Sequence, residues 1–466
     1  MKEYIIKKNY NTKAIQRLID SIGEDGGIIR FPKGKYELAT LFLKNNVQIY
    51  LDKGARLSGT KRFEEYAKVE PLGFKAYQDM SHCDFRCAMF VGDCCENISI
   101  KGQGLIDMRS VWDEDNLKNR TEIDFDPKVE PGIDHRGAKC IALKCCKNVE
   151  ISGIKIINAT DLAVYFAWCE NVTVKRLRLR VYIDGISPDN CKNVKITDCD
   201  IESGDDGIVL KSSYNLNKSG SCDNIYIADC RIKSRCNAIK FGTESNGAFK
   251  NITISDISIR QTRITGISIE SVDGAQIDNI NISNVRMRNV NAPIFIHLGK
   301  RLRGPKGLKV GSINNIKIDN VRATGPYNPY KIIEWNYESF LKKDDVQDPK
   351  LFGRAEGFLF DKKEDVWQFT SNICGLPGNS LKNVSLSNIY FSLDGGVTEY
   401  ESSVTEDAYI YPEVFVYGRV LPAKGIYFRH IDGLKLNNIK VRTKRMDTRK
   451  SIVLEDVNNL IIEDAE

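Results

Sequence analysis

Short stretches of alternating aliphatic and polar residues recur along this chain. Each copy opens with Asn, followed by Val or Ile, one spacer and a second aliphatic residue, as in Asn-Val-Glu-Ile at 148–151. The opening Asn stands at 148, 171, 193, 224, 251, 279, 315 and 383, so the copies are 23, 22, 31, 27, 28, 36 and 68 residues apart. Alternation with period two predicts strands that bury one face. A repeat of roughly 20 to 50 residues with variable additions predicts a solenoid whose loops lengthen at some corners.

The predicted strands are expected to stack on equivalent strands of the next repeat. Hairpins are disfavoured, because turn signals such as Asn-Gly are mostly missing between copies. Stacking in parallel closes the sheets around a narrow aliphatic core, and the opening Asn suits a turn whose amide can bond to the next coil. The fold prediction is therefore all-β, a parallel β-helix. The leucine-rich repeat is the main alternative solenoid, but its leucine spacing is absent.

We expect one domain over residues 1–466, with a helical cap within residues 1–27. Asn11-Thr12 precedes a helical pattern that stops near Gly26-Gly27, which suits a lid on the first coil. Between 320 and 380, aromatic and charged residues interrupt the repeat. Loops of that length in a compact domain are usually functional, so this insertion is expected to fold over one side and cover a cleft.

Composition narrows the classes of partner. The 466 residues are 42% hydrophobic and 28% charged, which is typical of a globular protein with an ample core. The net charge of +6 comes with no long basic run, so no nucleic-acid partner is expected. No window approaches the roughly 18 apolar residues of a membrane span, so no membrane partner is expected either. We make no prediction of oligomeric state.

The cysteines and the first residues bear on location. Residues 1–8 lack the apolar run and cleavage site of a signal peptide, which favours a cytoplasmic protein. Many of the 14 cysteines stand at equivalent repeat positions, as small buried side chains would. With no Cys-x-x-Cys pair, we expect reduced core thiols, no metal and no cofactor.

Three aspartates stand one repeat apart. Asp184 lies in Ile-Asp-Gly-Ile, and Asp205 and Asp206 lie in Ser-Gly-Asp-Asp-Gly, 21 residues later (205 − 184). Each motif alone is ordinary turn composition. On successive coils, about 4.8 Å apart, the three carboxylates would share one outer wall and repel one another. Repulsion raises at least one pKa, which supplies a general acid, while the other carboxylates activate water. The spacing therefore predicts hydrolysis of glycosidic bonds.

Beyond these aspartates, the chain resembles the polygalacturonases of glycoside hydrolase family 28 almost end to end. The similarity rests on Asn11 and Gly26-Gly27, on the motifs at 31–34 and 53–55, on the aspartates, and on the motifs at 375–378, 421–423 and 428–430. The resemblance implies a right-handed parallel β-helix and a metal-independent, inverting hydrolase of pectin-type glycans. It also implies that Asp205 is the general acid and that Asp184 and Asp206 hold the attacking water.

Several family motifs are altered here. The family's Asn-Thr-Asp reads Tyr182-Ile183-Asp184, and Asn237 replaces the histidine of its Gly-His-Gly. The lysine of its Arg-Ile-Lys, which binds the uronate carboxylate, is Glu270. A carboxylate there would repel galacturonate, so we expect a neutral sugar, or a uronate in another subsite. The predicted substrate-binding residues are Tyr182, Asn237, Lys240, Glu244 and Glu270.

Several other residues allow either a functional or a structural interpretation. Lys240 and Glu244 could bind sugar hydroxyls or form a surface ion pair. Arg263 could supply a displaced cation or be a solvated side chain. Tyr165 or Trp168 could stack on a sugar, although their alternation points at least one of them inward. His135 and His430 are the histidines that could reach the cleft.

The long insertion and the predicted location suit trimming of imported oligosaccharides from one end. Two other classes stay open. One is a calcium-dependent polysaccharide lyase on the same fold, in which clustered aspartates would bind the ion. The other is a carbohydrate-binding β-helix that has lost catalysis, consistent with the altered motif positions.

Overall fold

The computed structural model describes residues 1–77, 80–111, 113, 137–325, 369–399, 404, 412–418 and 420–464. Most of the predicted insertion, residues 326–368, and His135 lie outside these described residues. The chain divides into two compact units. Unit 1 comprises Met1–Asp124, Lys128–Ser203 and Ile208–Cys230, and unit 2 comprises Phe125–Pro127, Gly204–Gly207 and Arg231–Glu466.

Unit 1 consists of three stacks of short parallel strands. The first stack contains β1 (Lys2–Ile5), β2 (Gly27–Phe31), β5 (Val47–Leu51), β8 (Glu96–Gly102), β11 (Lys147–Ser152), β14 (Glu170–Lys175), β17 (Lys192–Thr197) and β20 (Ser221–Ala228). The second contains β3 (Gly34–Leu38), β6 (Ala55–Gly59), β9 (Leu105–Asp107), β12 (Lys155–Ile157), β15 (Arg178–Val181) and β18 (Asp200–Ser203). The third contains β4 (Leu41–Phe42), β7 (Ala88–Asp93), β10 (Lys139–Lys144), β13 (Val164–Ala167), β16 (Ile186–Asp189) and β19 (Ile208–Ser212).

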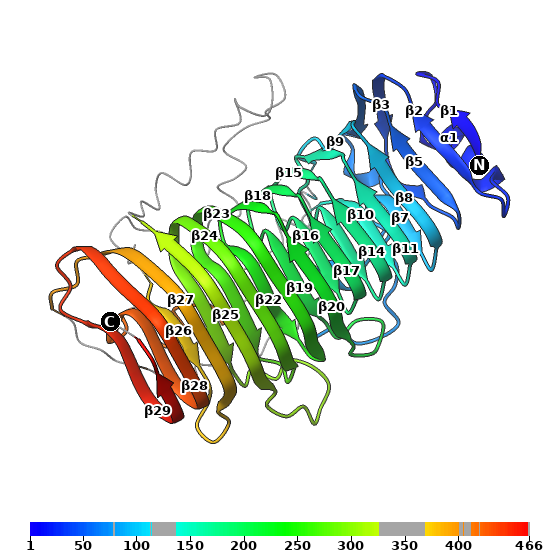
Figure 1. Ribbon diagram of the computed structural model, residues 1–466. Coiled ribbons are helices and arrows are strands. Elements are labelled where there is room, and N and C mark those ends of the chain that lie inside the picture. Colours follow the sequence, from blue (N-terminus) through cyan, green and yellow to red (C-terminus); the bar gives the residue numbers. More distant parts are fainter. Residues whose placement is uncertain are drawn as a thin grey trace. The chain divides into compact units, whose positions relative to one another are not determined.

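Unit 2 also consists of parallel strands, and several of them, such as β23 and β24, are more than 20 residues long. The strands are β21 (Arg231–Ser234), β22 (Asn237–Ser245), β23 (Ala248–Ser271), β24 (Gln276–Leu298), β25 (Ser312–Thr324), β26 (Ser371–Cys374), β27 (Leu381–Gly395), β28 (Ala423–Arg445) and β29 (Lys450–Ile462). Every pair with a described register is parallel. Figure 1 shows the strands of each unit stacked side by side. The predicted class, an all-β parallel β-helix, is confirmed.

Asparagine ladders mark the corners of the coils, as predicted. In unit 1, Asn171 Nδ2 donates to Asn148 Oδ1 at 3.1 Å, and Asn193 Nδ2 donates to Asn171 Oδ1 at 3.0 Å. In unit 2, Asn279 bonds to Asn251 in the same way at 2.8 Å. These residues adopt a positive φ near 55°, a conformation that Asn tolerates better than most residues. The ladder therefore turns the chain at a fixed position in each coil.

The predicted N-terminal helix is present. Helix α1 (Thr12–Ser21) begins after Asn11, whose Oδ1 accepts from the Ala14 N–H at 2.9 Å and caps the helix. Two residues of the helix, Ile15 and Ile19, are fully buried. Two short 3-10 helices, η1 (Phe63–Glu65) and η2 (Met80–His82), follow in unit 1. Among the described residues, no helix is both long and apolar enough to cross a membrane.

The cysteines are free thiols, and most of them are buried. All 14 are unpaired, and only Cys94, Cys145 and Cys236 are exposed or half-buried. In unit 1 the Cys169 Sγ accepts from the Cys146 N–H at 3.3 Å, and the Cys191 Sγ accepts from the Cys169 N–H at 3.4 Å. Thiols therefore line successive coils as core residues, as the repeat predicted.

Candidate active site

The predicted aspartates fall in both units. Asp184 belongs to unit 1, in the turn between β15 and β16. Its backbone carbonyl accepts from the Ala163 N–H at 3.0 Å, which fixes the turn to the preceding coil. The side chain is buried, and its Oδ2 lies 3.8 Å from Nζ of Lys211 on β19. The ammonium and the carboxylate form a buried ion pair.

Tyr182, two residues before Asp184, packs inside unit 1. The residue is 2% exposed, and its hydroxyl lies 2.9 Å from Ser110 Oγ. The hydrogen bond gives the buried phenol its polar partner. The structure thus buries this predicted substrate-binding residue beside Ser110.

Asp205 and Asp206 lie in unit 2, in the segment Gly204–Gly207. Asp206 is buried, and its Oδ1 accepts from both the backbone N–H and the side-chain Nδ2 of Asn237, each at 3.0 Å. Asp205 is half-buried, and its backbone carbonyl accepts from Ser234 Oγ at 2.6 Å. The two neighbours therefore differ. One carboxylate is held by fixed donors, and the other side chain is partly open to solvent.

Lys240 lies among three carboxyl groups in unit 2. Its Nζ is 2.7 Å from Glu413 Oε1, 3.7 Å from Glu270 Oε1 and 3.9 Å from Asp206 Oδ2. All four side chains are 8% exposed or less. Asn237 Nδ2 also lies 3.4 Å from Glu413 Oε1. The positive charge of Lys240 is thus compensated inside the protein, which leaves it less able to attract an anionic sugar.

Glu270 is buried on β23, and its charge state differs from that assumed from the sequence. Burial raises the pKa of this carboxyl group to about 8, with Lys240 opposing the shift and Glu413 adding to it. At neutral pH Glu270 is therefore mostly protonated. Its Oε1 lies 2.5 Å from Ser268 Oγ. The expected repulsion of a uronate by Glu270 is correspondingly weaker, but no cation stands at this position.

Two buried acceptors in the same cluster lack donors. No described residue donates to Glu270 Oε2 or to Asn237 Oδ1, although both residues are fully buried. A buried polar atom without a partner costs about 1–3 kcal/mol, so such atoms usually face a ligand or ordered water. Both acceptors suit the hydroxyl groups of a sugar.

Glu244 and Glu413 show what sequence reasoning did and did not find. Glu244 lies on β22 with Lys240, but its partner is Arg303, with Nη2 3.5 Å from Glu244 Oε1. Both side chains are buried, Lys240 beside Glu413 and Glu244 beside Arg303, so neither belongs to a surface ion pair. Glu413 was missed. It is 143 residues beyond Glu270 (413 − 270) and has no motif around it, so nothing in the sequence could have identified it.

The secondary candidates divide between core and surface. Tyr165 is fully buried and stacks on Phe85 with ring centroids 5.3 Å apart, so packing is its role. Trp168 is partly exposed and lies 3.9 Å beneath Lys218 Nζ. His430 Nδ1 lies 2.6 Å from Asp456 Oδ2. Burial and the Asp205 carboxylate raise the pKa of the Cys236 thiol, and the Arg263 guanidinium opposes this rise.

Comparison with known proteins assigns the chain to a family. A family model described as glycosyl hydrolases family 28 matches residues 28–334. A probable polygalacturonase of Vitis vinifera is 22% identical over 215 residues, which cover 44% of this chain and 42% of that protein. The exo-poly-alpha-D-galacturonosidase of Dickeya chrysanthemi is 22% identical over 426 residues, covering 82% of this chain and 67% of that protein.

A solved structure of similar fold supports the architecture. The exopolygalacturonase from Thermotoga maritima has a TM-score of 0.62 at 17% identity, covering 84% of this chain and 87% of that chain. At this identity the likeness shows a shared fold. The chain spans less than half the length of the plant relative and about two thirds of the bacterial one.

Proposed function

Because the chain belongs to glycosyl hydrolases family 28, we propose that it hydrolyses glycosidic bonds in a pectin-type or related glycan. The observation that carries the proposal is the Asp205-Asp206 turn, in which two donors of Asn237 hold one carboxylate while its neighbour stays half-buried. Two carboxyl groups in different environments are what an acid and a water-activating base require. The activities named for the relatives point to the same reaction class.

The roles of the three aspartates are proposed from the sequence and the family. Asp184 and Asp206 each precede by two residues an isoleucine, Ile186 or Ile208, and these two isoleucines are paired in β16–β19. We propose that Asp184 and Asp206 hold the attacking water and that Asp205 is the general acid, the roles that membership of family 28 implies.

The proposed reaction proceeds with inversion. The Asp205 carboxyl group donates its proton to the glycosidic oxygen as the bond from that oxygen to the anomeric carbon breaks. Water attacks the anomeric carbon from the opposite face, and its proton passes to the carboxylate of Asp206 or Asp184. The donors of Asn237 engage Asp206 Oδ1, and Lys240 Nζ lies 3.9 Å from Asp206 Oδ2, so the carboxylate that would orient the water is itself held in place. No step calls for a metal ion.

The subsite next to Asp206 is proposed to bind a neutral sugar. Glu270 stands where the family has a lysine, and the charge of Lys240 is compensated by Glu413 at 2.7 Å. The unpartnered acceptors Glu270 Oε2 and Asn237 Oδ1 suit hydroxyl donors rather than a carboxylate. A protonated Glu270 can also donate one hydrogen bond. A uronate would then be bound, if at all, in a neighbouring subsite.

We also propose that the enzyme acts from one end of the glycan and that it works in a reducing compartment. The name of the Dickeya chrysanthemi relative supports exo action. The 14 free thiols favour a reducing compartment such as the cytoplasm, where buried cysteines stay unpaired.

A panel of pectin-type oligosaccharides with neutral or acidic terminal sugars tests the proposal. We expect single sugars to be released from one end, with neutral termini preferred. A product with an ultraviolet-absorbing double bond, whose formation stops when EDTA is added, would instead indicate a calcium-dependent lyase. Binding without any product would indicate a carbohydrate-binding protein.

A further inference from the structure

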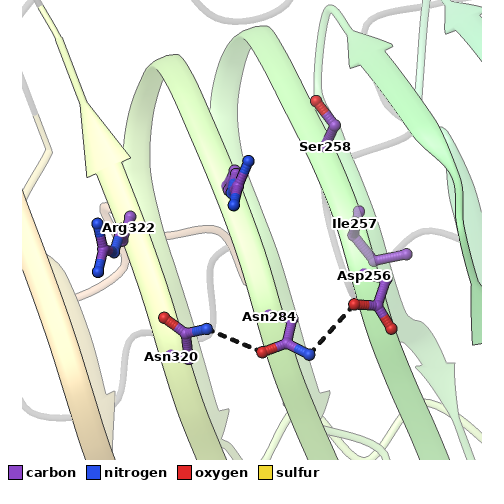
Figure 2. Close-up of a pocket in the computed structure, with 7 residues that line it drawn as sticks. Asp256, Ile257, Ser258, Asn284, Asn320 and Arg322 are labelled. Atoms are coloured by element: carbon purple, nitrogen blue, oxygen red, sulfur yellow. Dashed lines mark hydrogen bonds between the residues drawn. The ribbon is translucent and has the colours of Figure 1, made fainter.

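A second polar surface lies in unit 2, where the long strands bend. Asp256, Asn284 and Asn320 adopt positive φ values of 57°, 56° and 50°. The strands β23, β24 and β25 therefore turn at equivalent residues. The concave corner is a groove of about 550 Å³, lined by these three residues and by Ser258, Arg286 and Arg322. Figure 2 shows the Asn284 amide bonded on both sides, to Asp256 at 3.1 Å and to Asn320 at 2.8 Å. We call this surface the basic groove.

Arginines are stacked directly on one another along the basic groove. Arg286 on β24 pairs in register with Arg322 on β25, and Arg260 on β23 pairs with Arg288 on β24. All four side chains are exposed. Like charges directly opposite each other destabilise a sheet, so the arrangement costs stability in the absence of a counter-charge.

Three of these arginines, Arg286, Arg288 and Arg322, form no ion pair within the part of the chain that the structure describes. The carboxylates at the corner are engaged by amides, Asp256 by Asn284 and Asp319 by Asn388.

Unit 1 shows the opposite arrangement. On β15, Arg180 lies 3.2 Å from Asp200 and 3.4 Å from Glu202, both on the next strand, β18. Arg180 in unit 1 thus has the acidic partners that Arg286, Arg288 and Arg322 lack among the described residues.

A second hollow extends the basic groove toward β27 and β28. It measures about 420 Å³, shares Asn320 and Arg322 with the first hollow, and adds Tyr390 and Lys440. Tyr390 lies in register between Arg322 and Lys440. The surface thus offers cations, amides and a half-buried aromatic ring in one row across successive strands.

We propose that the basic groove binds an anionic polysaccharide chain, as a site additional to the candidate catalytic aspartates. The arginines match the carboxylates of the glycan, the amides match its hydroxyl groups, and the Tyr390 ring can pack against a sugar face. A linear polyanion fits a row of charges that repeats with every coil. The proposal does not depend on which bond the enzyme cleaves.

Binding of polygalacturonate to the full chain tests the proposal. Measurements use calorimetry in an Asp205→Asn background, so that cleavage cannot remove the probe. The test variant carries Arg286→Gln, Arg288→Gln and Arg322→Gln. The matched control carries Lys317→Gln, Lys382→Gln and Lys435→Gln, which remove the same charge from exposed positions on β25, β27 and β28.

The test variant is expected to bind polygalacturonate about tenfold more weakly, because each exposed ion pair contributes about two- to threefold. The control should bind within about twofold of its parent, added salt should weaken binding, and a neutral galactan should not compete. The melting midpoint of the test variant should be unchanged or higher, since stacked like charges are removed. Equal losses in both variants, no loss in the test variant, or tighter binding of duplex DNA or anionic vesicles than of polygalacturonate would overturn the proposal.

Discussion

Replacing Lys240 by methionine tests the charge balance of the candidate site. Lys240 is the cation that lies within 4 Å of Asp206, Glu270 and Glu413, and its side chain is almost fully buried. Methionine has a similar length and no charge, so it removes the ammonium while largely preserving the packing. The substitution leaves at least two buried carboxylates without their counter-charge.

The expected loss follows from the distances. With an effective dielectric constant of about 20, the attraction to Glu413 at 2.7 Å is about 6 kcal/mol and that to Asp206 at 3.9 Å about 4 kcal/mol. Glu270, with its pKa raised to about 8, adds little at neutral pH. The cost of desolvating the ammonium offsets much of this attraction. Breaking a buried pair at one partner typically costs about 3–5 kcal/mol, which is the loss we expect at pH 7.

Urea unfolding followed by far-ultraviolet circular dichroism measures this loss at pH 7. Adding Glu413→Gln to Lys240→Met should recover about 2 kcal/mol in a double-mutant cycle. The exposed Lys317→Met serves as the control and should stay within about 0.5 kcal/mol of the parent. If Lys240→Met costs no more than Lys317→Met, or if the two cluster variants are additive, the charge balance described here is wrong.

Two further predictions concern other buried groups. Because the folded pKa of Glu270 is raised from 4.5 to about 8, its protonated form contributes stability that is fully present below about pH 4.5 and is lost as the pH rises to about 8. The unfolding free energy should therefore fall less between pH 5 and pH 8 in Glu270→Gln than in the parent. The exposed Glu463→Gln is the control and should keep the parent's slope, and an unchanged slope in Glu270→Gln would contradict the raised pKa. Titration with a thiol reagent should modify at most Cys94, Cys145 and Cys236 rapidly in the native chain and all 14 cysteines after denaturation, whereas rapid reaction of more thiols would contradict the buried thiol rows.

Much of the fold could be predicted because its determinants are local and repeated. The alternation around Asn148, Asn171 and Asn193 predicted both the strands and the amide ladder, and each ladder bond joins consecutive copies of the motif. Asn11 predicted the helix start in the same way, since a cap acts within three residues of its position. Periodicity and capping need no knowledge of distant contacts.

The rest of the candidate site depends on distant contacts. Glu413 reaches Lys240 across 173 residues, so no local pattern connects them. The charge of Glu270 was misjudged because a sequence shows the residue type but not the burial that raises its pKa. Lys240 and Glu244 are four residues apart, yet they face different partners. The basic groove arises from the register of β24 with β25, which spacing alone does not define.

The anomeric configuration of the first product, followed by proton magnetic resonance in the parent chain and in Asp205→Asn, tests the proposed mechanism most directly. We expect a product of inverted configuration from the parent. We expect the rate of Asp205→Asn to be lower by about 10²–10⁴-fold, the range expected when a general acid is removed. A retained configuration, or an Asp205→Asn chain that cleaves the same glycan at the parent rate, would contradict the proposed mechanism.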